Sequence, residues 1–240
     1  MRSLKILLLI LGVITALSLI FAGPIPVFLQ WYNPHMWLGQ SAWGIENFFY
    51  WQIFTYILVP PLESEASFGF LINTFFTLYL LWTVGSSLIF QKGIKTFWML
   101  FLGGGAIGGL MTALTLHFSH AQGLLAGWTP ALYSLLMGWM LLNPRARVLV
   151  FLAIPMQVKW VVVGAAAITL YLDLTNGHYL QFVASFSSVL FGYLYAIIAW
   201  ETHSPFHGLY KLEKFLHRFK GKKSFEFEVD EQYERYQRSR

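Results

Sequence analysis

The sequence predicts an all-α membrane protein that crosses the bilayer with six helices, the fourth of them short and central, and has both termini in the cytoplasm. Three observations support this fold class. Of the 240 residues, 57% are hydrophobic and only 11% are charged. Five apolar runs approach or exceed the roughly 20 residues that a helix needs to cross a bilayer. The basic residues recur at alternate connections between these runs, which is the pattern of cytoplasmic loops.

The apolar runs give the helices in chain order. The run 131–142 is shorter than the others, because Pro130 and Asn143-Pro144 bound it, and at 1.5 Å per residue it reaches about 20 Å. A helix this short leaves non-helical backbone at membrane depth, which is tolerated only inside protein or beside a water-filled cavity. The fourth helix is therefore expected at the centre of the bundle. The five longer runs are 4–22, 68–90, 96–118, 158–174 and 180–200.

The first run also has a second interpretation, a cleaved signal peptide. Arg2 and Lys5 precede it, and Phe21-Ala22-Gly23 ends it. Its uninterrupted length and the five hydrophobic segments after it favour a helix that is retained. It is therefore counted among the six crossings.

The basic residues set the orientation. Cytoplasmic loops of membrane proteins are rich in Lys and Arg, whereas the connections 23–67, 117–123 and 173–178 contain neither. The basic residues of the first 200 lie before the first run and in the other connections, so both termini are expected in the cytoplasm. These residues are Arg2, Lys5, Lys92, Lys95, Arg145, Arg147 and Lys159.

Charge divides the chain into two parts. Residues 1–200 are expected to form the membrane domain, and residues 201–240, with nine basic and seven acidic side chains, a charged cytoplasmic tail. The segment 210–219 of this tail is basic and amphipathic, so anionic lipid or a cytoplasmic partner could bind it. The loop 23–67 is rich in aromatic residues, which favour the membrane interface, so part of it is expected in the outer leaflet.

Composition excludes several kinds of site. The chain has no cysteine and therefore no disulfide, thiolate or Cys-based metal site. Its histidines lack metal-ligand spacing such as HExxH. The net charge of +5 is too unevenly spread to indicate nucleic-acid binding, and the expected surroundings are lipid. The glycines of 103–109 follow no strand and precede no phosphate-binding lysine, so they indicate close helix packing. No cofactor or metal is predicted.

Three polar side chains fall at one depth in the predicted bundle. Asn73, Thr129 and Ser185 each lie roughly 8–10 Å below the outer surface. Each also has a structural interpretation. Thr129 before Pro130 has the pattern of a helix N-cap followed by the first helical residue. Asn73 is expected to hydrogen-bond across helices. Ser185 belongs to a series of small residues that is typical of close helix packing, with Ser188, Gly192 and Ala196.

Several longer segments together resemble a known family. The first outer loop ends in WQIFTY (51–56), and the second run reads FGFLINTFFTLYLLWTVGSSLI (68–89). A glycine-rich third run follows, and then NPRARVLVFLAIPMQVKW (143–160) and ASFSSVLFGYLYA (184–196). In this order and topology the segments resemble the rhomboid intramembrane protease superfamily over roughly residues 45–200. The resemblance implies the six-helix rhomboid bundle.

The resemblance also implies where an active site would lie. Rhomboid proteases place a serine in a G-x-S-G box at the start of the short fourth helix, and this chain has Gly127-Trp128-Thr129-Pro130 there. Their general base is a histidine of the sixth helix, where this chain has Ser185. Their second helix holds the oxyanion with H-x-x-x-N, which here is Gly69 and Asn73. The tryptophan-arginine pair of their first loop is Trp51-Gln52 here.

These departures predict an inactive site. Serine cannot accept a proton at neutral pH, and general-base catalysis contributes about 10²–10⁴-fold. Gly69 offers no side-chain donor, and loss of one oxyanion donor costs about 2.7–4 kcal/mol. By resemblance to inactive rhomboid-like proteins, the expected function is that of a pseudoprotease. It would bind transmembrane segments of client proteins and influence their stability, trafficking or assembly.

Two other functions stay open at this stage. One is an active rhomboid-type peptidase with a diverged Thr129 site, for which His178 is a candidate base although it lies about two helical turns above Ser185. The other is a channel or carrier, for which the chain offers only Asp173 and Lys159 as charged residues close to the apolar runs. The expected location is a bacterial inner membrane, with the ER membrane as the alternative.

Overall fold

The computed structural model describes residues 2–22, 33–61, 68–119, 123–150 and 154–200. The predicted cytoplasmic tail, 201–240, lies outside the described residues, as do parts of the loop 23–67. The described chain is mostly helical, with two short two-stranded sheets. This confirms the prediction of a helical membrane protein at the level of fold class.

Five helices are long and apolar enough to cross a membrane. Their bounds agree with the predicted apolar runs to within two residues, because in each case the run of apolar residues ends at a basic residue, a glycine or a short polar turn. These helices are α1 (Arg2–Ala22), α6 (Phe68–Lys92), α7 (Ile94–Ser119), α9 (Val158–Thr175) and α10 (Tyr179–Trp200).

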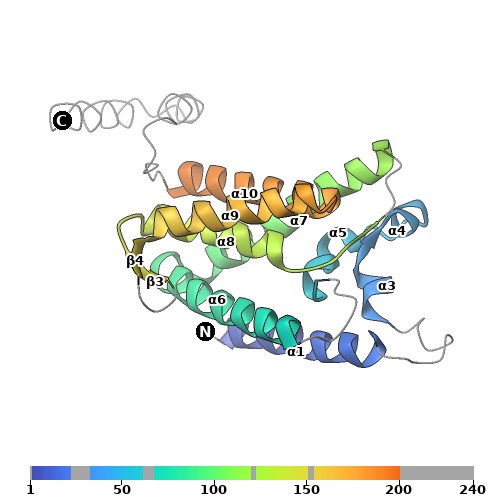
Figure 1. Ribbon diagram of the computed structural model, residues 1–240, viewed down its shortest axis with the longest axis horizontal. Coiled ribbons are helices and arrows are strands. Elements are labelled where there is room, and N and C mark those ends of the chain that lie inside the picture. Colours follow the sequence, from blue (N-terminus) through green and yellow to red (C-terminus); the bar gives the residue numbers. More distant parts are fainter. Residues whose placement is uncertain (1, 23–32, 62–67, 120–122, 151–153, 201–240) are drawn as a thin grey trace.

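The short helix α8 (Thr129–Leu142) lies among the long ones, as expected. It contacts α6, α7, α9 and α10, and all but three of its residues are buried. Figure 1 shows α1 and α6 on one side of α8, with α9 and α10 on the other. The core of the protein is centred on α8 and includes Leu135, Met140 and the facing rings of Phe97 and Phe101.

Glycines bring the central helices into close contact. A Cβ atom added at Gly192 of α10 would lie 2.5 Å from the carbonyl oxygen of Ser134 in α8. A Cβ atom at Gly105 of α7 would lie 2.9 Å from the Cγ2 atom of Ile57. Membrane helices pack through small residues because the lipid is as apolar as the helix surface, so van der Waals contact favours association. The interpretation of the glycine-rich run as a packing surface is confirmed.

The long first loop folds against one end of the bundle. It contains α3 (Pro34–Leu38), α4 (Ala42–Glu46), α5 (Gln52–Thr55) and a 3-10 turn, η1 (Tyr56–Leu58). Strand β1 (Gln40–Ser41) pairs antiparallel with β2 (Leu124–Leu125), which precedes α8. Side chains cap the first two helices: Asn33 accepts from the His35 N–H, and Ser41 accepts from the Gly44 N–H. The loop therefore has its own local structure and contacts α7 through α4, α5 and β1.

A β-hairpin joins α8 to α9 at the other end of the bundle. Strands β3 (Arg147–Val150) and β4 (Ile154–Gln157) are antiparallel, with Arg147 opposite Gln157. At its base the Val158 N–H donates to the Ala146 carbonyl at 2.9 Å. This hairpin has no clear signal in the sequence, because its strands are four residues long and lie within an apolar stretch between two helices.

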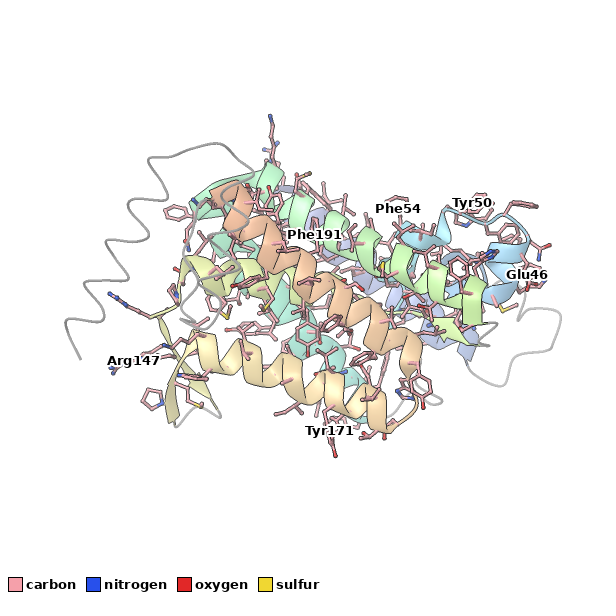
Figure 2. All side chains as sticks on the ribbon, turned by 90° about the horizontal axis from the view of Figure 1, so that it is seen from above. Glu46, Tyr50, Phe54, Arg147, Tyr171 and Phe191 are labelled. Carbon is pink, nitrogen blue, oxygen red and sulfur yellow. The ribbon has the colours of Figure 1, made fainter. Side chains whose placement is uncertain are left out.

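The two ends of the bundle differ in charge. Figure 2 shows Glu46 and Tyr50 at the end that carries the first loop, called the loop end here, and Arg147 at the opposite end. Every described Lys and Arg lies at this opposite end, called the basic end, in or beside the starts of α1, α7 and α9 and the ends of α6 and α8. Lys92 there lies over the ring of Trp200 at 5.5 Å, which places the end of α10 at the basic end too.

Candidate functional site

Thr129 is the first residue of α8 and not its N-cap. Trp128 holds the capping position with φ −80° and ψ −4°, and no side chain caps the helix. A capping residue normally has extended backbone angles, which let its side chain reach back to the first amides. The helical turn begins one residue earlier than predicted, with Pro130 as its second residue. The prediction of a Thr129 cap is therefore wrong.

The first loop covers the backbone that leads into α8. Residues 125–128 are buried, and the Gly127 N–H donates to the Tyr56 carbonyl at 3.1 Å. Gly127 has φ +122°, which strongly favours glycine, and a Cβ atom there would lie 3.3 Å from Cγ of Pro61. Of the predicted site box, Gly127, Trp128 and Pro130 are thus buried packing residues, while Thr129 is partly exposed.

Ser185 lies in the tight contact between α10 and its neighbours. Its side chain is fully buried, and its Oγ atom has no hydrogen-bond partner. One turn further along, the Ser188 Oγ donates to the Gly104 carbonyl at 2.7 Å. The buried residues of α10 include Ser185, Ser188, Gly192 and Ala196, so the interpretation of this series as a packing surface is confirmed.

Gly69 and Asn73 lie on the exposed side of α6. The residues of α6 that face the bundle near this level are Phe70 and Thr74, which are 4% and 8% exposed. Successive residues of a helix are about 100° apart, so a helix that buries Thr74 turns Asn73 away. The expected hydrogen bond from Asn73 across helices is absent from the described structure, and this prediction is wrong. Asn73 and Ser185 therefore do not meet in one site.

Trp51 and Gln52 organise the first loop. Trp51 is exposed, and its ring N–H donates to the Trp37 carbonyl at 3.0 Å. Gln52 is fully buried, where its Oε1 accepts from the Ser41 N–H at 3.3 Å and its Nε2 is 3.4 Å from the Met36 carbonyl. Where the family has a charged arginine, this chain thus has a neutral amide that joins three segments of its own loop.

Polar side chains also bind the carbonyl groups of the glycine-rich part of α7. The Tyr56 hydroxyl donates to the Gly105 carbonyl at 2.9 Å, and the Gln40 amide donates to the Gly109 carbonyl at 2.8 Å. Burial raises the pKa of Tyr56, so its phenol remains a neutral donor. These bonds fix the first loop to α7. Sequence reasoning missed them, because neither residue stands in a recognisable motif.

Tyr56 and Gln40, which contact residues 125–127 through a backbone hydrogen bond and strand pairing, carry a hydroxyl and an amide. The described part of the chain contains no cluster of three His, Cys, Asp or Glu residues that could hold a metal ion. His178 is exposed in the turn between α9 and α10, and His35 makes its bond to the Pro60 carbonyl in the loop. Burial lowers the pKa of His35, while that carbonyl opposes the shift. No described contact links a histidine to Thr129 or Ser185.

A buried acid near the same end was not among the predicted site residues. Asp173 lies in the last turn of α9, is 9% exposed, and has a buried Oδ2 atom without a hydrogen-bond partner. One turn nearer the basic end, Thr169 of α9 hydrogen-bonds the Tyr133 hydroxyl of α8 at 2.5 Å. The sequence shows a single acidic residue in this apolar run. Its burial depends on the rotation of α9 about its own axis, which the sequence does not show.

No protein-family model matches this chain, and a search of curated proteins finds no significant match. The likeness to rhomboid proteases therefore rests on the sequence segments 51–56, 68–89, 143–160 and 184–196 and on their order.

Proposed function

We propose that this protein is a catalytically inactive, rhomboid-like membrane protein that binds transmembrane segments of client proteins and influences their stability, trafficking or assembly. The observation that carries the proposal is Asn73, whose amide is exposed on an apolar helix with no described hydrogen bond. Among the described residues, no hydrogen bond joins Thr129 to a histidine or an acid, which supports the inactive half of the proposal.

A peptidase reaction at Thr129 would need a base that removes its proton. A hydroxyl close to its free pKa is a weak nucleophile without such a group. The residue at the family's base position, Ser185, has an unpartnered hydroxyl, which is not a base at neutral pH. The family's second oxyanion position, Gly69, is exposed on α6 and has no side chain to donate. These features argue against hydrolysis at this position.

Asn73 supports binding because of its surroundings. Phe75, Phe76 and Tyr79 of α6 are also exposed, at 74%, 55% and 56%. In a bilayer, these apolar side chains face lipid, and an amide among them has no water with which to hydrogen-bond. A second helix with a polar side chain at that depth would provide the partner. Such interhelical hydrogen bonds contribute about 0.6–2 kcal/mol each in membranes.

The absence of cysteine allows a clean test. The variant Phe76→Cys, labelled with a photo-crosslinker in native membranes, is expected to capture membrane proteins, preferentially with a single span. A second substitution, Asn73→Leu, should reduce the yield several-fold. The control is Ile168→Cys on the exposed face of α9, which is 63% exposed and should capture different neighbours. Equal capture from both positions, unaffected by Asn73→Leu, would contradict the proposal.

The same material tests the enzymatic alternative. Purified full-length protein is expected not to cleave rhomboid-type substrates in proteoliposomes. Cleavage that disappears in Thr129→Ala would replace the proposal with an active peptidase. For location we propose a bacterial inner membrane with the basic end in the cytoplasm, since Lys and Arg favour cytoplasmic loops. Thiol labelling of Ala146→Cys from the cytoplasmic side alone is the expected result.

A further inference from the structure

Asp173 lies far from every described Lys and Arg of the chain. The described acidic residues are Glu46, which is exposed in the first loop, and Asp173, which is buried in α9. Tyr171, two residues earlier, points away from the bundle in Figure 2. Asp173 follows it by about 200° around the helix and therefore faces inward. Its carboxylate lies among apolar helices near the loop end.

Three features make this carboxylate unfavourable by itself. It is nine-tenths buried, and burying an ion without a partner is costly. Its Oδ2 atom accepts no hydrogen bond. It also lies two residues before the end of α9, where the helix dipole disfavours negative charge. Ionisable residues inside membrane segments usually have a functional partner, so the missing partner of Asp173 is the informative point.

The described part of the chain has no Lys or Arg near Asp173. All described Lys and Arg residues lie at the basic end, and α9, with 18 residues, separates the two ends by about 27 Å. The connections 23–67, 117–123 and 173–178 contain no Lys or Arg. A second copy in the same orientation would bring no such residue either. No described Lys or Arg of this chain can therefore pair with Asp173.

The neighbouring groups do not replace that cation. The His178 ring interacts electrostatically with the Asp173 carboxylate, and the His178 backbone N–H donates to the Asp173 backbone carbonyl at 2.8 Å, but no described ion pair joins the two side chains. The hydroxyls of Tyr133 and Thr169 bond to each other. A bare metal ion needs several free oxygen ligands, whereas an ammonium or guanidinium group can pair with one carboxylate. The donor set therefore fits a basic side chain better than a metal.

We propose that Asp173 recognises a lysine or arginine near the loop end of a partner's transmembrane helix. The inference rests on the proposed client-binding function and names the class of client. A long basic side chain can lie along apolar surface and bring its charge to a partly covered acid. Clients with one basic residue in the outer part of their span are thus bound, and clients with a purely apolar span are bound weakly.

The test uses the full-length protein in lipid nanodiscs and three synthetic single-span helices. The three helices are identical except at one position, which is Lys, Leu or Asp. This position lies near the end of the helix that is at the same membrane depth as the loop end of the protein. The wild-type protein is expected to bind the Lys helix about tenfold or more tightly than the Leu helix. Asp173→Asn should remove this difference and keep or raise the thermal stability, because it removes an unpaired buried charge. Asp173→Lys should transfer the preference to the Asp helix.

Glu46→Gln is the matched control, since it removes one negative charge from the same end at an exposed position. It should retain the preference for the Lys helix. Equal binding of the Lys and Leu helices by the wild-type protein would overturn the inference while leaving client binding intact. Binding of none of the helices would overturn both. Stabilisation of the wild type, but not of Asp173→Asn, by sodium or calcium without any helix would assign the site to a metal and also overturn the inference.

Discussion

Gly192 offers the sharpest test of how the central helices are packed. A methyl group added there would lie 2.5 Å from the carbonyl oxygen, 2.8 Å from Cα and 3.0 Å from the carbonyl carbon of Ser134. All three atoms belong to the backbone of α8, so no side-chain rotation can relieve the contact. We expect Gly192→Ala to force α8 and α10 apart, at the cost of about 1–3 kcal/mol that overpacking typically incurs.

Replacing glycine by alanine also favours any helix by about 0.5–1 kcal/mol, so a matched control is needed. Gly164 of α9 has nothing within 4 Å of an added Cβ atom, and Gly164→Ala should gain that propensity without a clash. The difference between the two variants then isolates the packing cost, about 1–3 kcal/mol. It can be measured from the free energy of unfolding of the full-length protein during denaturant titration in mild detergent. Equal stability of the two variants would refute the close contact between α8 and α10.

Two further predictions concern the first loop. Tyr56→Phe leaves the buried Gly105 carbonyl without its hydrogen-bond donor and should destabilise the loop by about 1–3 kcal/mol. The loss of stability should appear as faster proteolysis of the loop. The control Tyr79→Phe, on the exposed side of α6, should not change the rate of proteolysis. Burial lowers the pKa of His35 from its ordinary value of 6.5. As the pH falls, the unfolded loop therefore binds a proton at His35 before the folded loop does. The folded loop should thus lose stability as the pH falls from 6.5 to the lowered pKa. Hydrogen exchange of the loop at pH 5 and 7.5 should show this dependence, and His35→Gln should abolish it; an unchanged dependence would assign it to another group.

The positions of the long helices could be predicted from composition alone. A span must be apolar over about 20 residues, and its ends are marked by polar or basic residues, so length and charge fix its bounds. The shortness of α8 follows in the same way from Pro130 and Asn143-Pro144. The small residues of α10 were also correctly interpreted, because close packing in a membrane requires small side chains whatever the partner helix is.

The candidate site could be predicted only in part. The sequence identified Thr129, Ser185 and Asn73 as polar residues at one depth, but the structure exposes Asn73 on α6 and buries Ser185, so these two do not meet. A soluble helix shows its buried side by the spacing of its apolar residues. In α6 both sides are apolar, because one side contacts protein and the other contacts lipid. The spacing of apolar residues therefore does not show which of Asn73 and Thr74 faces the protein.

The sequence by itself determined that this is a helical membrane protein and which segments form its long helices. Only the tertiary structure decided that Asn73 is exposed, that Gln52 links three segments of the first loop, and that Asp173 is buried with an Oδ2 atom that has no hydrogen-bond partner. The physical reason is that a helix must contain enough consecutive apolar residues to cross the bilayer, and this is a property of each segment by itself. The rotation of each helix depends on side-chain contacts with its neighbours, and these contacts arise only when the helices are assembled.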